Sequence, residues 1–185
     1  SIDPETADWK RAGWPRKVAS AKGETMAIES IGVIGGGAWG TALAQTLRLA
    51  GRRVTLWARE AETVDDINAR HVNRTFLPGV PLAPGLTATG ELAALASADA
   101  LLMVAPAQHV RTIAKQLRPQ LRPGQPVVLC AKGIEQTTGR MLGDVLTEVL
   151  PDQTLAVLSG PSFAADVARG LPAALTIACQ REDMG

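Results

Sequence analysis

The 185-residue chain has a formal net charge of +1, with 46% hydrophobic and 20% charged residues, a composition typical of a globular domain. This charge gives no reason to expect nucleic acid or an anionic membrane as a partner. No apolar stretch reaches the ~18 residues of a transmembrane helix, so we expect no membrane insertion. Cys130 and Cys179 lie in apolar runs and indicate reduced, buried thiols of a cytoplasmic protein. The isolated His71 and His109 add no metal-ligand spacing, so no metal site is expected.

Residues 1–25 differ in composition from everything that follows. They mix acidic and basic residues around Trp9 and Trp14, without the apolar core of a secretory signal. We interpret this segment as a disordered extension or tag. The alternative is a short amphipathic helix that docks on the domain or on a partner. Residues 26–185 are expected to form one domain.

Short apolar runs alternate with segments of helical period along the rest of the chain. Strands are expected near residues 31–34, 54–57, 86–89, 100–104, 126–131, 154–158 and 173–179. Helices are expected over residues 40–50, 60–70, 91–96, 108–117, 139–150 and 162–169. This alternation predicts an α/β fold with a doubly wound, mostly parallel sheet of the Rossmann type.

A glycine-rich turn joins the first strand to the first helix. Gly35, Gly37 and Gly40 have the G-x-G-x-x-G spacing of dinucleotide-binding loops. In such loops the first glycine makes the turn, the second admits a diphosphate close to the backbone, and the third lets the helix pack on the strand. We therefore predict that NADH or NADPH binds at the positive end of this helix.

Ligands of open α/β sheets bind beyond the carboxyl ends of the strands, which draws attention to the residues that follow each strand. Arg59 lies 24 residues after Gly35, where a basic residue suits the 2′-phosphate of NADPH; the alternative is a solvated surface arginine. Lys132 could hold an anionic substrate or polarise a carbonyl group, unless it is simply an exposed loop residue. Ser162 is expected to cap the helix over 162–169, whose end would be a second anion site.

Two further loops stand out. In the segment 104–107, Pro106 stiffens a run of small side chains on which a cofactor could lie flat. The connection 70–81 is polar, contains proline and is long for an α/β fold. Long ordered connections of this kind are often functional.

Five segments, in the same order, closely resemble the bacterial NAD(P)-dependent glycerol-3-phosphate dehydrogenase family: Gly35–Leu43, Leu56–Arg59, Asn73–Gly79, Ala131–Glu135 and Leu158–Ala164. The resemblance spans Ile31 to Cys179 and does not include residues 1–25. It implies an enzyme that transfers hydride reversibly between NAD(P)H and dihydroxyacetone phosphate. The product, sn-glycerol 3-phosphate, is a precursor of membrane phospholipids.

The resemblance also implies roles for particular residues. Coenzyme contacts are implied for Ala38, Trp39, Arg59 and Ala164. Gly160 and Ser162 would contact the substrate, and Lys132 would contact both and position the substrate. The family often has serine at the position of Ala38, so at most one hydrogen bond to phosphate is lost here.

Family members carry an all-helical second domain, whose lysine is the general acid/base. This chain has no lysine after Lys132, so we expect the cofactor-binding domain alone, which binds NAD(P)H but turns over poorly or not at all. An apolar face that the second domain would cover is expected to favour self-association, and a homodimer is left open. The alternatives are a related reductase, for a hydroxyacyl-CoA or ketopantoate, and a non-catalytic NAD(P)-sensing module.

Overall fold

The computed structural model describes residues 18–19, 25–26 and 28–179. Of residues 1–25, the structure describes Val18, Ala19 and Thr25. They belong to a short antiparallel pair of strands, β1 (Val18–Ala19) and β2 (Thr25–Met26). The interpretation of the rest of residues 1–25 lies outside the described residues.

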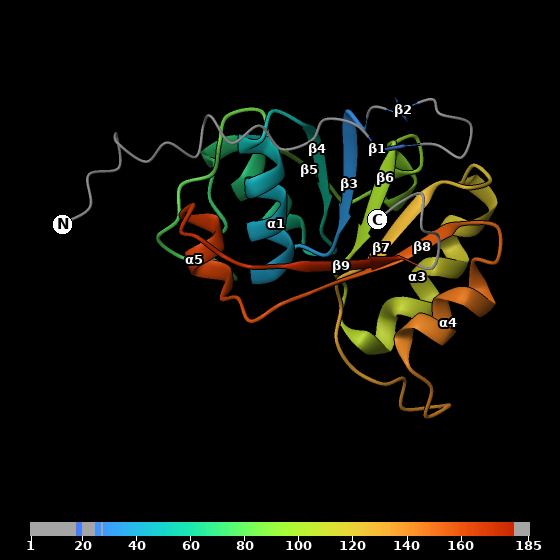
Figure 1. Cartoon of the computed structure of the whole chain (residues 1–185). Helices are drawn as coiled ribbons and strands as arrows, with labels where there is room; N and C mark the ends of the chain where they lie inside the picture. The colour runs from blue at the N-terminus through green and yellow to red at the C-terminus, as the bar shows by residue number, and fades with distance from the viewer. Residues whose placement is uncertain (1–17, 20–24, 27, 180–185) are drawn as a thin grey trace.

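Seven strands form one twisted sheet in the order β5-β4-β3-β6-β7-β8-β9 (Figure 1). Their bounds are β3 Ser30–Ile34, β4 Arg53–Trp57, β5 Thr87–Thr89, β6 Ala100–Met103, β7 Pro126–Leu129, β8 Thr154–Ser159 and β9 Thr176–Cys179. All neighbouring pairs are parallel except β8 and β9. The prediction of a doubly wound, mostly parallel sheet is confirmed. The strand order reverses between β3 and β6, which is where such sheets bind ligands.

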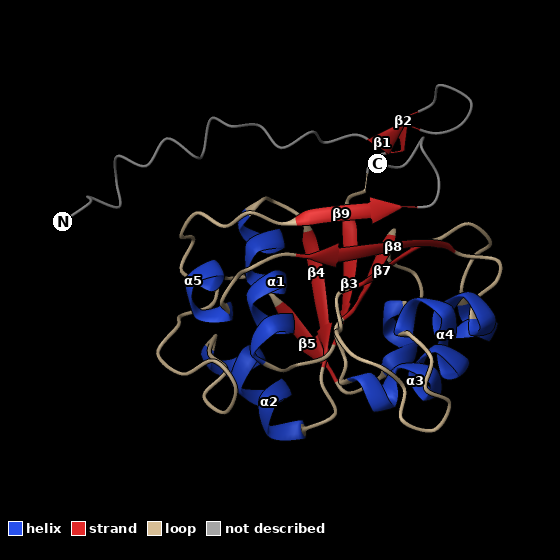
Figure 2. Ribbon diagram, turned by 60° about the horizontal axis from the view of Figure 1, so that its bottom comes forward, coloured by secondary structure: helices blue, strands red, loops and turns tan. Residues whose placement is uncertain are grey.

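Helices cover both faces of this sheet, with α1, α2 and α5 on one side and α3 and α4 on the other (Figure 2). The α-helices are α1 Ala38–Leu49, α2 Ala61–Asp65, α3 Val110–Leu117, α4 Leu142–Val149 and α5 Ala164–Ala168. A π-helical turn η2 (Asp66–Arg70) follows α2, and 3-10 turns are η3 (Leu92–Leu95), η4 (Ala107–His109) and η5 (Arg118–Gln120). No helix in the described ranges is long and apolar enough to cross a membrane.

Alternate residues of the central strands build two cores, one under each helical layer. Leu101 and Met103 of β6 pack with Val110 of α3 and Leu146 of α4, whereas Leu102 packs with α1. Because both faces are buried, these strands are continuously apolar, as the sequence pattern indicated.

Four expectations need correction. The helix over 60–70 divides into α2 and η2, and that over 91–96 is the 3-10 turn η3. Ser162 does not cap a helix, because its backbone N–H bonds to the Gly160 carbonyl in a turn (3.0 Å) and α5 begins after Phe163. Both cysteines are free, but only Cys130 is buried, since Cys179 lies on the edge strand β9.

Candidate functional site

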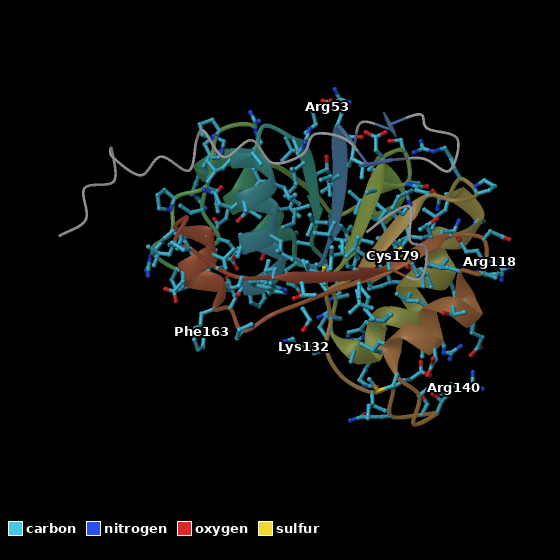
Figure 3. The ribbon with its side chains drawn as sticks, viewed as in Figure 1. Arg53, Arg118, Lys132, Arg140, Phe163 and Cys179 are labelled. Atoms are coloured by element: carbon cyan, nitrogen blue, oxygen red, sulfur yellow. The ribbon has the colours of Figure 1, made fainter. Side chains whose placement is uncertain are left out.

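Four loops that follow the adjacent strands β3, β6, β7 and β8 surround a pocket of about 400 Å³ at the carboxyl edge of the sheet. Figure 3 shows Lys132 and Phe163 at this edge, with Arg53 at the opposite edge, where β4 begins. Small, apolar and aromatic residues and one charged residue line the pocket: Ala38, Trp39, Val104, Ala105, Pro106, Ala107, Cys130, Ala131, Lys132, Gly160, Ser162, Phe163 and Ala164.

The glycine-rich loop has the backbone that its spacing predicts. Gly35 turns off β3 with φ +128°, a conformation that favours glycine. A Cβ at Gly40 would lie 1.9 Å from the Gly35 carbonyl oxygen, so α1 can approach the end of β3 only with glycine there. A Cβ at Gly37 would meet no heavy atom within 4 Å. The backbone at Gly37 is therefore open to a ligand.

Helix α1 presents its N-terminal end beside this open backbone. Its N-cap is Gly37, which supplies no side-chain cap, and no acidic residue occupies the first turn. The first N–H groups of a helix lack partners within the helix, and its dipole makes this end positive. Because α1 is 12 residues long, it has a full helix dipole, and its N-terminal end favours an anion such as a diphosphate.

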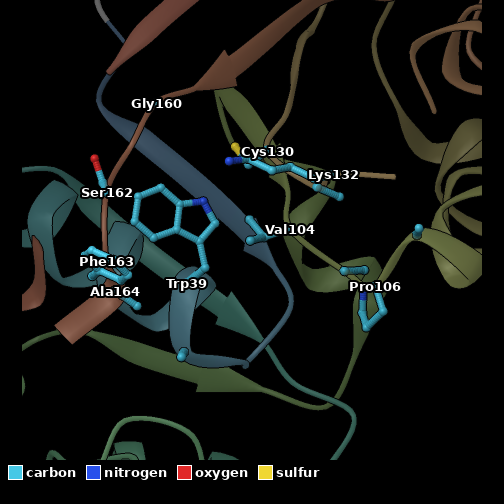
Figure 4. A pocket seen from close by; sticks show the side chains of 13 residues that line it. Trp39, Val104, Pro106, Cys130, Lys132, Gly160, Ser162, Phe163 and Ala164 are labelled. Carbon is cyan, nitrogen blue, oxygen red and sulfur yellow. The ribbon is translucent and has the colours of Figure 1, made fainter. Parts of the chain in front are cut away.

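Trp39, the second residue of α1, lies in the middle of the pocket residues. Figure 4 shows its indole ring with Gly160, Ser162, Phe163 and Ala164 on one side and Val104, Pro106, Cys130 and Lys132 on the other. The loop 104–107, singled out as a flat surface of small side chains, lines the pocket as well. The result is a slot with apolar walls, suited to planar rings.

The loop that carries Lys132 is held at several points. Buried Glu135 accepts two hydrogen bonds from the Arg111 guanidinium, at 2.8 and 3.0 Å, and one from the Thr138 hydroxyl at 2.6 Å. The Gln108 amide donates to the Ile134 carbonyl at 3.0 Å. Arg111 first, and then Thr138, hold the pKa of Glu135 below its ordinary value, so this carboxylate stays ionised. The backbone around Lys132 is thus fixed against the helical layer of α3.

Ser162 brings a polar atom to the pocket that has no partner. Its hydroxyl oxygen is buried and makes no hydrogen bond. A buried polar group without a partner costs free energy, which a bound ligand could recover by supplying one. This orphaned hydroxyl, the open backbone at Gly37 and the cation of Lys132 fit a phosphate-bearing nucleotide.

The structure brings six of the predicted site residues together in the pocket lining: Ala38, Trp39, Lys132, Gly160, Ser162 and Ala164. Gly35, Gly37 and Gly40 shape the loop behind it. Arg59 is not in the lining. It follows β4, the neighbour of β3, and its exposed guanidinium donates to the Glu60 carboxylate at 3.1 and 3.2 Å.

Sequence reasoning gave no pocket role to Cys130 or Phe163. Cys130 directly follows the last residue of β7, and its place near the end of the strand predicted over 126–131 was the available signal. Burial raises the pKa of the Cys130 thiol to about 12. Phe163 is 79% exposed at the pocket margin, and no local pattern indicates that. Among the described residues, no group of three or more metal-ligating side chains is present.

Comparison with known proteins identifies relatives of the whole described domain. The family model "NAD-dependent glycerol-3-phosphate dehydrogenase N-terminus" matches residues 30–185. The chain is 58% identical over 158 residues to glycerol-3-phosphate dehydrogenase (NAD(P)+) of Parvibaculum lavamentivorans, covering 85% of this chain and 47% of that protein. The same enzyme of Paramagnetospirillum magneticum is 57% identical over 158 residues, covering 85% of this chain and 58% of the relative.

Comparison with solved structures points to the same family. Glycerol-3-phosphate dehydrogenase of Coxiella burnetii superimposes with a TM-score of 0.77 at 32% identity, covering 83% of this chain and 47% of that chain. A ketopantoate reductase of Ralstonia eutropha, at 20% identity and a TM-score of 0.57, shares the fold alone. The chain spans about half the length of the curated relatives it matches. These matches confirm the predicted family resemblance.

Proposed function

This chain belongs to the family of NAD-dependent glycerol-3-phosphate dehydrogenases, and from that membership we propose that its pocket binds NADH or NADPH. The observation that carries the proposal is the open backbone at Gly37, at the N-terminal end of α1 and beside the pocket. An anion can approach this backbone without meeting a side chain. Gly35, Gly37 and Gly40 would hold the coenzyme's diphosphate there.

The coenzyme, when bound, supplies the hydride for reduction of a ketone. The chain's own residues would bind the coenzyme, orient it and exclude water from the pocket. Trp39 and Ala164 line the space for the coenzyme, and Lys132 attracts an anionic group or the polarised oxygen of a carbonyl. The hydroxyl of Ser162 and the backbone of Gly160, which also line the pocket, would contact the substrate. The relatives are named for glycerol 3-phosphate. With the family resemblance, this name supports sn-glycerol 3-phosphate and dihydroxyacetone phosphate as the substrate pair that we propose.

We propose that this chain supplies the coenzyme-binding domain for the reaction. We also propose that the reaction takes place in the cytoplasm. Among the described residues that line the pocket, only Lys132 is charged, and the thiol of Cys130 stays protonated near neutral pH. We therefore propose no general acid among these residues and give Lys132 a positioning role. The 185-residue chain by itself is expected to bind NAD(P)H and to oxidise it negligibly when dihydroxyacetone phosphate is added.

Calorimetric titration of the chain with NADH and with NADPH tests the proposal. Gly37→Ala introduces one methyl group where the diphosphate must approach, at φ −69° and ψ 179°, which alanine adopts without strain. We expect this variant to lose about tenfold or more in affinity, equivalent to ~1.4 kcal/mol. Gly143→Ala is the matched control, because a Cβ there also meets no atom within 4 Å but Gly143 lies on α4, away from the pocket lining.

Absence of binding of either coenzyme to the folded wild-type chain would refute the proposal. Equal affinities of Gly37→Ala and wild type would show that the nucleotide binds elsewhere.

A further inference from the structure

Asn73 lies in the long connection 70–81, to which the proposed function gives no task. The residue is only 1% exposed. Its side-chain oxygen accepts the Phe76 N–H at 3.0 Å, and its own carbonyl accepts the Leu77 N–H at 2.9 Å. The segment 73–77 therefore closes on itself and fixes the orientation of the Asn73 amide.

The other end of this amide reaches the glycine-rich loop. The Nδ2 group of Asn73 donates to the Gly36 carbonyl at 2.9 Å and to the Thr41 hydroxyl at 2.8 Å. The Thr41 hydroxyl donates in turn to the same Gly36 carbonyl at 3.3 Å. All three residues are buried, so water does not compete for these bonds.

These bonds set the direction of one peptide group. In a trans peptide the carbonyl of Gly36 and the N–H of Gly37 point in opposite directions. Holding the Gly36 carbonyl on Asn73 and Thr41 therefore turns the Gly37 N–H away from them, and it keeps a carbonyl oxygen from facing an incoming anion. Without the Asn73 amide, this glycine peptide has a single, longer hydrogen bond to restrain it.

We propose that Asn73 is the positioning residue of the phosphate-binding loop: by anchoring the Gly36 carbonyl it aims the Gly37 N–H at the diphosphate. This rests on the proposed function, since it assigns the loop that ligand. The proposal gives the connection 70–81 a task, because Asn73, three residues after η2 ends, contacts the loop after β3 through Gly36.

Asn68 offers a control within the same chain. It is an exposed asparagine on η2 whose amide makes two bonds of similar length to backbone, donating to the Ala88 carbonyl at 2.9 Å and accepting the Ala88 N–H at 2.8 Å. These bonds secure the edge strand β5 instead of the glycine-rich loop. Asn68→Ala and Asn73→Ala thus each remove a side-chain amide that donates to one backbone carbonyl and accepts a backbone N–H, at two different places.

The test measures the affinity of each variant for NADPH, ADP-ribose and adenosine by calorimetry and ligand-observed NMR. For Asn73→Ala we expect NADPH and ADP-ribose, which contain the diphosphate, to bind about tenfold or more weakly, and adenosine to bind unchanged. For Asn68→Ala we expect all three affinities to stay at wild-type values. The thermal unfolding midpoint should fall in both variants. Thr41→Val, which retains the bond from Asn73 to Gly36, should lose less NADPH affinity than Asn73→Ala.

A folded Asn73→Ala that binds NADPH as wild type does would overturn the inference, as would an equal loss of adenosine affinity, which a general structural defect produces. If Asn73→Ala does not fold, Asn73→Ser decides, because a serine hydroxyl can still accept the Phe76 N–H in a turn but is too short to reach the Gly36 carbonyl. A selective loss of diphosphate ligands by this variant supports the inference, and wild-type affinity for them overturns it. If the wild-type chain binds no nucleotide, it is the proposed function that fails. The two failures are therefore distinguishable.

Discussion

Lys132 sets the sign of the ligand group that the pocket prefers. It is the only charged residue among the described residues that line the pocket, and the walls around it are mostly apolar. A cation beside apolar walls attracts an anion more strongly than it would in open water, because the local dielectric is lower. The preference between NADH and NADPH should then depend on a charged residue outside the lining, and Arg59 is the residue predicted for this role.

Replacing Arg59 should change the preference between the two coenzymes. Its guanidinium can pair with the 2′-phosphate that only NADPH carries, so Arg59→Ala should weaken NADPH about tenfold and leave NADH nearly unchanged. Glu60→Gln should act in the opposite direction, because the Glu60 carboxylate now holds that guanidinium. The measurement is the ratio of the two dissociation constants for each protein. A wild-type chain that bound NADH tenfold more tightly would contradict the assignment.

The two cysteines should differ in reactivity. The thiolate is the reactive form, and burial raises the pKa of Cys130 to about 12, so almost none is present at pH 8. Cys179 is partly exposed on β9. Iodoacetamide should therefore modify Cys179 and spare Cys130 in the native chain, with both modified after denaturation. Peptide mapping by mass spectrometry reads the result, and earlier labelling of Cys130 would show that its burial is transient.

At the scale of elements, one arginine joins two helices and the loop of Lys132. Arg111 of α3 binds Glu135 in the loop and Glu148 of α4, with the Nη1 of Arg111 2.6 Å from the Glu148 carboxylate. Arg140 adds a second bond to Glu148 at 2.7 Å. Glu135 is the buried member, so its charge depends on Arg111 for compensation.

This network predicts an acid-dependent stability. The pKa of Glu135 is held below its ordinary value of 4.5, chiefly by Arg111. A carboxyl with a lowered folded-state pKa stabilises the fold above its unfolded pKa, and the stabilisation is lost as pH falls through the folded pKa. Glu135→Gln should therefore lower the urea midpoint at pH 7, and its difference from wild type should shrink as pH falls below about 4.5.

Glu148→Gln is the companion variant, because it removes a carboxylate from the same guanidinium at a half-exposed position. Its effect on the urea midpoint should be smaller at every pH. A difference between wild type and Glu135→Gln that stayed constant down to acid pH would mean that ionisation of Glu135 does not contribute.

Elements read from local pattern were predicted well, whereas contacts made across the fold were not. Glycine spacing and apolar runs are local, so the turn at Gly35 and the carboxyl-edge positions of Lys132 and Ser162 were accessible from the sequence. The hydrogen bond from Asn73 to Gly36 joins residues 37 positions apart, and buried Asp66 accepts hydrogen bonds at 2.8 Å from Arg74, which comes after η2 has ended. No periodicity encodes such pairs.

Ser162 is a residue at which the local sequence pattern predicted a feature that the structure does not have. Serine before a helical segment favours an N-cap, yet the bond from its N–H to Gly160 places the residue in a turn. Gly160 itself is fixed by a distant segment, since a Cβ there would lie 2.4 Å from the Ala174 carbonyl oxygen. The segment before β9 therefore packs closely on the turn that contains Ser162, a contact that the local pattern does not reveal.

At the scale of the molecule, the sheet is covered unevenly. In the described part of the chain no helix lies over β9, the strand at one end of the sheet (Figure 2). Large apolar side chains are exposed on and around this end: Val157, Phe163, Leu171, Leu175 and Ile177. Val157 pairs with Ala178 and Leu158 with Ile177, so Val157 and Ile177 point to opposite faces. The sheet end is apolar on both sides, as the expectation of an uncovered face requires.

Self-association of the chain should follow from this exposed end. Contiguous apolar surface and an open strand edge both favour contact between copies, so the weight-average sedimentation coefficient should rise with protein concentration. Val157→Thr together with Ile177→Thr keeps β-branched residues in both strands while adding polar groups, and should reduce this rise. Leu49→Gln is the control, because Leu49 is 45% exposed at the end of α1, away from β9. Concentration dependence that is equal in all three proteins would place the contact elsewhere on the molecule.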